Sequence, residues 1–326
     1  MQSRFPIAVG AGLVSGLLFL AAATGAMASL MVLVFLTPLP IVIAGFSWGW
    51  ILAAIASLTA FGFLTVIGSI TAGLFHLLLF GLPATVAIYY VLLNRSVSTA
   101  SGRADIEWYP VGRVLFGLAV FSGIVAAAAL FAVGTTMGDL EAHITKVVDR
   151  MMTADLPWPG GKKPEAEQLA GLTKLLTISF AAAISMAWMW LILFNLWIGA
   201  KVARASGLLE RPWPNVSLTV LPSWAGLALA AAMGLSFLEG FVGLVASGFA
   251  TGAFVAFLLV GLAIIHNVTW KNPLRPALLF GLYAFLLFFN PLSSMAIATI
   301  ALIEPFLPMR NPYNGGPITK DPPDEK

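Results

Sequence analysis

Five polar or aromatic side chains in this sequence fall within or beside long apolar stretches, where each could contact a bound molecule. They are His76, Trp188, Trp190, Asn195 and Glu239. Indole rings with a single amide suit a flat organic ligand, and a carboxylate at similar depth could hold a partly cationic group. The sequence therefore predicts that a ligand, if one binds, lies in the outer half of a helical bundle near Trp188, Trp190 and Glu239.

Each of these residues also has a purely structural interpretation, which is the preferred one. His76 must face the protein interior or a cavity, because lipid would leave its ring nitrogens unpaired, and a structural hydrogen bond would satisfy it. The tryptophans and Asn195 can pack between helices or form an interfacial aromatic belt. Glu239 can be a solvated residue in a turn.

No arrangement of residues in the sequence indicates catalysis. Cysteine is absent, and the three histidines, His76, His143 and His266, lie far apart, so no HExxH zinc motif is possible. The sequence has no nucleotide-binding glycine loop, no nucleophile elbow and no aspartate inside an apolar stretch. We therefore expect no enzyme, no metal site and no cofactor. The absence of a basic run argues against binding to nucleic acid.

The composition indicates where these residues lie. The chain is 60% hydrophobic and 10% charged, with a mean hydropathy of +0.95, which suits a surface in contact with a lipid bilayer. We expect an all-α, polytopic transmembrane bundle of about eight to nine membrane helices. The predicted segments are 6–23, 26–46, 50–67, 70–93, 111–134, 174–202, 222–238, 241–266 and 275–306. The last segment is either one kinked helix or a hairpin, because Asn290-Pro291 interrupts it.

Lysine and arginine in the loops predict the orientation. Alternating segments place residues 94–110, 201–221 and 267–275 on the same side as Arg4, and this positive side should be cytoplasmic. The expected protein is a multi-pass protein of the bacterial inner membrane with a cytoplasmic N-terminus. The tail after Arg310 lies outside if the last segment crosses once, and inside if it is a hairpin.

Residues 1–310 are predicted to form a single transmembrane domain, followed by a disordered polar tail, 311–326. Loop 135–173 should be extracytoplasmic, with an amphipathic helix over residues 139–152 that covers the bundle. The apolar face of this helix would carry Leu140, Ile144, Val147, Val148 and Met151. Glycines four residues apart, such as Gly12 with Gly16 and Gly248 with Gly252, are expected to serve close helix packing.

Several short motifs resemble the YybS-like family of uncharacterised bacterial membrane proteins. They are Thr37-Pro38-Leu39-Pro40, Leu82-Pro83-Ala84, Leu92-Leu93-Asn94-Arg95, Glu107-Trp108-Tyr109-Pro110, Asn195-Leu196-Trp197, Arg211-Pro212-Trp213-Pro214 and Ile303-Glu304-Pro305-Phe306 with Arg310. This family is grouped with the S components of energy-coupling-factor transporters and with MreD. The resemblance implies an S-component-like helical core, but it carries over no substrate and no site residue.

Two functions remain open at the level of sequence. The first is a small-molecule-binding or transport subunit, which would depend on a separate partner protein for ATP. The second is a membrane scaffold or complex subunit with an MreD-like role, recruiting another membrane or cytoplasmic protein. A cavity with buried polar groups would favour the first, and a solidly packed bundle would favour the second.

Overall fold

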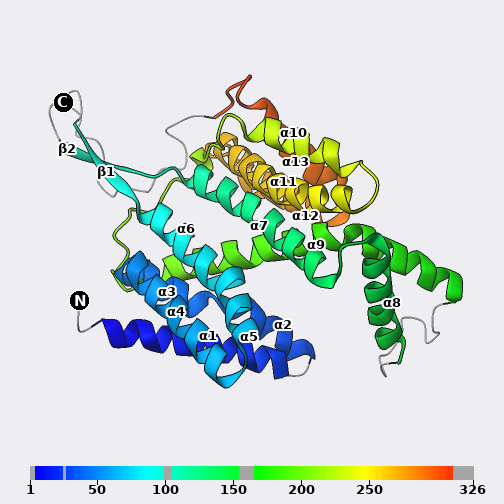
Figure 1. Ribbon diagram of the computed structural model, residues 1–326. Helices are drawn as coiled ribbons and strands as arrows, with labels where there is room; N and C mark the ends of the chain where they lie inside the picture. Colours follow the sequence, from blue (N-terminus) through cyan, green and yellow to red (C-terminus); the bar gives the residue numbers. More distant parts are fainter. Residues whose placement is uncertain (1–3, 25–26, 99–103, 154–164, 311–326) are drawn as a thin grey trace, which may run out of the picture. The chain divides into compact units, whose positions relative to one another are not determined.

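The computed structural model describes residues 4–24, 27–98, 104–153 and 165–310, and these residues are almost entirely helical (Figure 1). The predicted tail, 311–326, lies outside the described residues. Long apolar stretches become helices because a helix pairs its backbone groups within its own segment, as lipid requires. The helices are α1 (Phe5–Thr24), α2 (Met27–Leu36), α3 (Leu39–Trp48), α4 (Trp50–Ile67), α5 (Ile70–His76), α6 (Leu82–Leu92), α7 (Val111–Val133), α8 (Met137–Thr153), α9 (Ala166–Ala205), α10 (Ala225–Ser236), α11 (Phe241–Val268), α12 (Arg275–Phe288) and α13 (Leu292–Ile303).

Six described helical stretches are long and apolar enough to cross a membrane, so the chain is an all-α, multi-pass membrane protein. They are Phe5–Ala22, Trp50–Ile67, Ile70–Leu92, Val111–Val133, Ala166–Ala205 and Phe241–Val268. Helix length alone therefore supports six crossings among the described residues, fewer than the eight to nine that the sequence predicts. The other three predicted segments form the shorter helices α2 with α3, α10, and α12 with α13.

The chain divides into two compact units. The first contains Met1–Leu118, Trp190–Pro222 and Phe257–Lys326, and the second contains Ala119–Met189 and Ser223–Ala256. Each unit has its own interior of fully or nearly fully buried apolar side chains: Ile41, Leu64 and Ile88 in the first, and Leu140, Ile144 and Val148 in the second.

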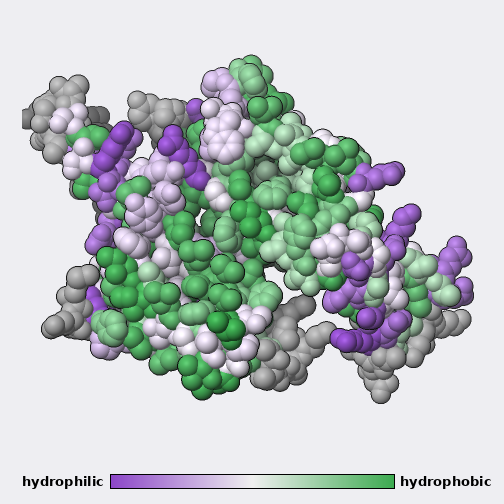
Figure 2. Space-filling view, in the orientation of Figure 1, coloured by the Kyte–Doolittle hydropathy of each residue, from purple (hydrophilic) through white to green (hydrophobic). Residues whose placement is uncertain are grey.

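The surface of the helices is apolar, as expected for lipid contact. Val66, Phe280 and Leu287 are among the large apolar side chains that are mostly exposed. Figure 2 shows hydrophobic residues over much of the visible surface, with hydrophilic side chains gathered over α8 and near the strands β1 and β2. A water-soluble domain would bury so large an apolar area, whereas lipid covers it without cost.

Glycines bring neighbouring helices into close contact within each unit. A Cβ atom on Gly12 of α1 would clash with the carbonyl oxygen of Ala56 in α4. In the second unit, a Cβ atom on Gly252 of α11 would clash with the carbonyl oxygen of Ala119 in α7. Both glycines belong to the pairs predicted for helix packing, and both face another helix of the same chain.

We expect Gly12→Val to destabilise the first unit by roughly 1–3 kcal/mol, because the added methyl groups must push α1 away from α4. Gly10→Val is the matched control, since nothing lies within 4 Å of a Cβ atom at Gly10 of the same helix. Thermal unfolding of both variants in a neutral detergent measures the difference. Equal melting temperatures for the two variants would contradict the packing of α1 against α4.

Helix α8 is the predicted amphipathic helix, and it begins with a reciprocal cap. The N–H of Asp139 donates to the Thr136 hydroxyl at 3.2 Å, and the Asp139 carboxylate accepts from the Thr136 N–H at 3.1 Å. The Thr136 hydroxyl also donates to this carboxylate at 2.7 Å. These bonds, led by the one from the Thr136 hydroxyl, lower the pKa of Asp139 and keep it ionised at the positive end of the helix.

The apolar face of α8 is narrower than its sequence suggested. Leu140, Ile144 and Val148 are buried in a cluster with residues of α7, α9 and α11 in the second unit. Val147 was expected on this face, but that prediction is wrong, because its side chain is 36% exposed against 3% for Val148. A helix advances 100° per residue, so adjacent positions differ this much in exposure. The side chain of Met151 and residues 154–164 lie outside the description.

One element of the first unit was not predicted. Strands β1 (Asn94–Ser98) and β2 (Ala104–Trp108) pair as an antiparallel hairpin between α6 and α7. Arg95 lies opposite Glu107, and their side chains form an exposed ion pair with an N–O distance of 2.6 Å. The described parts of the segment 94–110, which is predicted to be cytoplasmic, thus form a two-stranded hairpin. Its pairing brings together the motifs that contain Arg95 and Glu107.

The last apolar segment is a helical hairpin, which resolves the alternative left open by the sequence. The carbonyl oxygen of Ile297 in α13 lies against Gly261 of α11. Asn267 near the end of α11 and Arg310 beyond the end of α13 each donate to Ser217, the first to its hydroxyl and the second to its carbonyl. Helices α11 and α13 therefore run in the same direction. Since α12 begins where α11 ends, α12 leads the chain away and α13 returns it to the same end.

Candidate functional site

His76 is fully buried in a hydrogen-bonded contact with Ser15. The Ser15 hydroxyl donates to the carbonyl of Thr37 at 2.6 Å, so its oxygen accepts from the Nε2 of His76 at 2.9 Å. In a serine nucleophile the histidine would instead accept the serine proton. His76 also packs edge-on against Phe19 and Phe80, and its helix continues as a π-helix over Leu77–Gly81. The sequence correctly required an interior position.

Asn195 lies at the break between helices α2 and α3, as Ser15 does, but comes from another helix. Pro38 and Pro40 lack N–H groups, and here helix α2 ends at Leu36 and α3 begins at Leu39. Asn195 of α9 donates to the carbonyl of Phe35 at 2.7 Å and to that of Leu191 at 2.8 Å. Together with Ser15 it satisfies carbonyl groups at the break that would otherwise be buried unpaired. Asn195 therefore binds main-chain oxygen directly, and His76 reaches the break through the Ser15 hydroxyl. The Nδ1 of His76 and the Oδ1 of Asn195 have no hydrogen-bond partner among the described residues.

The other three predicted site residues lie in different surroundings. Trp188 is buried in the second unit with its ring centroid 5.3 Å from that of Phe121. Trp190 belongs to the first unit and is 41% exposed, and Glu239 is exposed in the turn between α10 and α11. None of the five predicted residues is among the described residues that line the cavity of the first unit. Within the described residues, no group of three or more His, Asp or Glu side chains could hold a metal ion.

That cavity has a volume of about 830 Å³, and all its lining residues belong to the first unit. Its long walls are apolar and come from three helices, with Leu115 of α7, Leu196 of α9 and Val260 of α11 as examples. Cavities of this size and character are typical of small-molecule sites. It lies at the end of the helices predicted to be cytoplasmic, because residues of the segment 209–219 and Trp270 line it.

Two arginines, each beside a tryptophan, lie at this end of the cavity. The Arg211 guanidinium donates to the carbonyl of Val91 at 2.7 Å and lies 5.7 Å from the ring centroid of Trp108. The Arg275 guanidinium lies 4.5 Å from the ring centroid of Trp270. Such stacking holds a cation without neutralising it. Burial lowers the pKa of Arg211, although a guanidinium remains charged at any physiological pH.

A further aromatic stack supports the loop that carries Arg211. The ring of Trp213 lies between two cations of α9, with its centroid 4.8 Å from the Lys201 ammonium and 5.3 Å from the Arg204 guanidinium. Helix α9 ends just beyond them at Ala205, and the φ of 69° at Gly207 permits the turn that starts this loop. The family-like motif Arg211-Pro212-Trp213-Pro214 is thus a rigid wall of the cavity.

His266 and Tyr283 complete the polar lining on the side of α11 and α12. The Nδ1 of His266 lies 2.9 Å from the carbonyl of Leu262, and because a carbonyl only accepts, Nδ1 carries the proton. With the proton on Nδ1, the Nε2 of His266 accepts from the Tyr283 hydroxyl at 3.3 Å. These bonds fix both side chains at the cavity wall.

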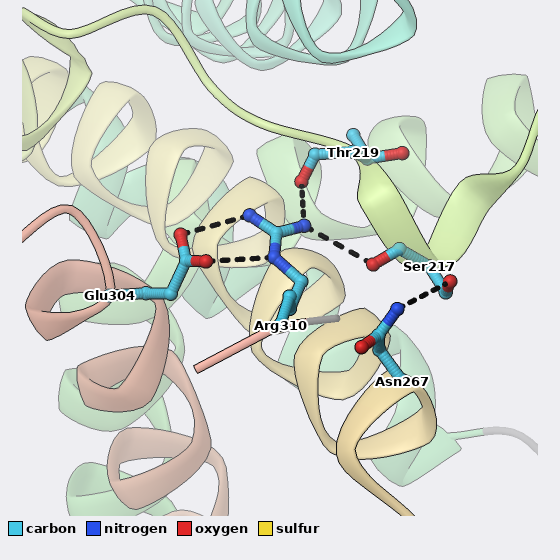
Figure 3. A network of polar contacts seen from close by, with 5 residues as sticks. All are labelled: Ser217, Thr219, Asn267, Glu304 and Arg310. Atoms are coloured by element: carbon cyan, nitrogen blue, oxygen red, sulfur yellow. Dashed lines mark hydrogen bonds and ion pairs between the residues drawn. The ribbon is translucent and has the colours of Figure 1, made fainter. Parts of the chain in front are cut away.

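A network at the same end joins the residues after α13 to the cavity loop (Figure 3). Arg310 makes a bidentate ion pair with Glu304, with both N–O distances 2.9 Å, and its remaining terminal nitrogen donates to the carbonyls of Ser217 and Thr219. Asn267 of α11 donates to the Ser217 hydroxyl at 3.2 Å. Ser217 and Thr219 line the cavity, so this network fixes the shape of its wall.

No family model matches the chain, and no curated protein or solved structure is similar enough to count as a match. The fold and the cavity alone therefore define the class, a multi-pass helical membrane protein with a small-molecule-sized cavity. Sequence reasoning used Arg211 and Arg275 only as markers of orientation. Trp270, five residues before Arg275, is the one local signal that it passed over, whereas Arg211 contacts the ring of Trp108 from a distant part of the chain.

Proposed function

We propose that this chain is a small-molecule-binding subunit of the bacterial inner membrane and that the cavity of the first unit is its ligand site. The observation that carries the proposal is a preformed cavity of about 830 Å³ with apolar walls and fixed polar groups at one end. A solidly packed bundle would offer no such space. The chain carries no nucleotide-binding motif, so active transport would require a separate energising protein.

The proposal includes an orientation and a number of crossings. Lysines and arginines of segments 94–110, 201–221 and 267–275 favour a cytoplasmic location for these segments and for the N-terminus. With α2 and α3 crossing together and α10 crossing with its flanking residues, the chain crosses eight times, and the α12–α13 hairpin enters and leaves on the cytoplasmic side. Membership of the YybS-like family, with an S-component-like core, remains part of the proposal.

The test is the small-molecule content of the protein purified from its native membranes. We expect mass spectrometry to find a co-purifying molecule, and we expect Ala263→Phe, which fills the cavity from α11, to reduce it about tenfold or more. Ala230→Phe on the exposed side of α10 is the matched control and should retain the molecule. Identical small-molecule content in all three proteins would refute a ligand site in this cavity.

A scaffold role is the alternative, and one observation favours it. Helix α12 has no buried residue, and Phe280, Leu287 and Phe288 are each more than three-quarters exposed. Lipid covers such a surface, but a partner helix could replace the lipid. A stoichiometric protein partner in the same purification, lost when Leu287 is replaced by alanine but retained in Ala263→Phe, would support the scaffold over the binding subunit.

A further inference from the structure

The cavity changes character along its length. Three helices line it over spans of eight residues, each with a rise of about 10 Å at 1.5 Å per residue: 111–118 of α7, 193–200 of α9 and 259–266 of α11. The deep ends of these spans are Leu118, Leu193 and Leu259. The shallow ends lie beside the segment 209–219 and the arginines. The cavity is therefore apolar toward the middle of the membrane and polar at the end that Arg211 and Arg275 line, which is termed its mouth.

The mouth carries positive charge without compensation. Arg211 and Arg275 line it, and none of the described lining residues is an aspartate or a glutamate. Among the described residues neither arginine forms an ion pair, in contrast to Arg310, which is held by Glu304. The Nε of Arg275 is buried and has no hydrogen-bond partner within the described part of the chain.

An unpaired buried N–H of a guanidinium is costly, and an oxygen supplied by a ligand would remove that cost. Arg275 is held in place by stacking on Trp270, which leaves the edge of its planar group free to bind two oxygens at once. Arg211 is 8% exposed, and of its hydrogen bonds the described part of the chain supplies only the one to Val91. Both side chains are preorganised donors for an anion.

We propose that the ligand is an amphipathic oxyanion. Its carboxylate or phosphate head binds Arg275 and Arg211 at the mouth, and its apolar tail lies between α7, α9 and α11. This inference rests on the proposed function of the same cavity and adds the chemical class of the ligand. A flat cationic molecule, which the sequence suggested for the outer half of the bundle, would be repelled by this mouth.

The experiment measures equilibrium binding to the full-length protein in phosphatidylcholine nanodiscs. The probes share one twelve-carbon tail: dodecyl phosphate, dodecanoate, dodecyltrimethylammonium and the neutral dodecyl maltoside. We expect saturable binding of the two acids, weakened about tenfold or more by Arg275→Gln and less by Arg275→Lys, which keeps the charge but loses the planar fork. Arg95→Gln, which removes an exposed cation of the β1–β2 hairpin, should bind the acids as the unmodified protein does.

Two further arms identify the source of the anion. If phosphatidylglycerol in the nanodisc competes with dodecyl phosphate, the ligand is a membrane lipid. If dodecyl phosphate binds equally well with and without phosphatidylglycerol, the ligand is a soluble amphiphile. Both outcomes support the inference. Full competition by inorganic phosphate alone would overturn the requirement for an apolar tail. Melting temperatures without probe show that each variant is folded.

The outcomes also separate this inference from the proposed function. Equal binding of the cationic, neutral and acidic probes, all lost in Ala263→Phe, would leave a ligand site in the cavity and overturn its preference for an oxyanion. Absence of saturable binding by any probe, together with no co-purifying molecule, would overturn both.

Discussion

Replacement of Arg310 by alanine should destabilise the protein by about 3–5 kcal/mol, one of the two largest effects that the structure predicts. The side chains of Arg310 and Glu304 are only 6% and 14% exposed, so the change leaves a buried carboxylate without its partner. It also leaves the carbonyls of Ser217 and Thr219 without their donor. Unfolding in neutral detergent, followed by circular dichroism, measures the loss.

The hairpin of strands β1 and β2 provides a matched control for the ion pair of Arg310 with Glu304. Arg95 and Glu107 form the same kind of pair with side chains 75% and 52% exposed, so Arg95→Ala should cost no more than about 1 kcal/mol. The double change of Arg310 and Glu304 to leucine should recover part of the loss, because no charge then remains buried. Similar losses from Arg95→Ala and Arg310→Ala would show that the Arg310 network contributes little.

The second large effect concerns α8. Val148→Asp places a carboxylate in the apolar cluster of the second unit and should cost at least about 3 kcal/mol, detaching α8. Val147→Asp, one residue away but exposed, should change stability by about 0.5 kcal/mol or less. Hydrogen exchange of the α8 amides measures detachment directly. Equal protection in the two variants would show that α8 does not pack through Val148.

The pH dependence of the Val148→Asp variant gives an independent check. Burial raises the pKa of a carboxyl group in the folded state, because it disfavours the charged form. The folded state then binds a proton more readily than the unfolded state, so the loss should shrink as the pH falls toward the folded-state value. The same loss at acid and neutral pH would indicate that the introduced carboxylate remains in water.

The sequence was informative wherever local composition decides the structure. Apolar length located the long helices, the two prolines located the break between α2 and α3, and periodicity located α8. It was less informative where polar residues continue a helix, as at the start of α9, or where a short alternating segment forms a strand, as in β1 and β2. At those places neighbouring elements decide the outcome.

The candidate site shows a second limit. The prediction correctly required an interior position for His76, but the hydrogen-bond partner of His76 is the Ser15 hydroxyl and those of Asn195 are main-chain carbonyls, which the sequence does not reveal. Arg211 and Arg275 were visible as basic loop residues. Their convergence on one cavity depends on contacts between segments more than sixty residues apart, which a single sequence does not reveal.

The hairpin of α12 and α13 has a consequence for biosynthesis. Its helices have 14 and 12 residues, and neither is long enough to be inserted as a crossing segment by itself. The pair must enter the bilayer together, and α13 needs the groove at Gly261 to receive its backbone. Because α13 packs on α11 at Gly261, the hairpin can take its final position only once α11 is in place.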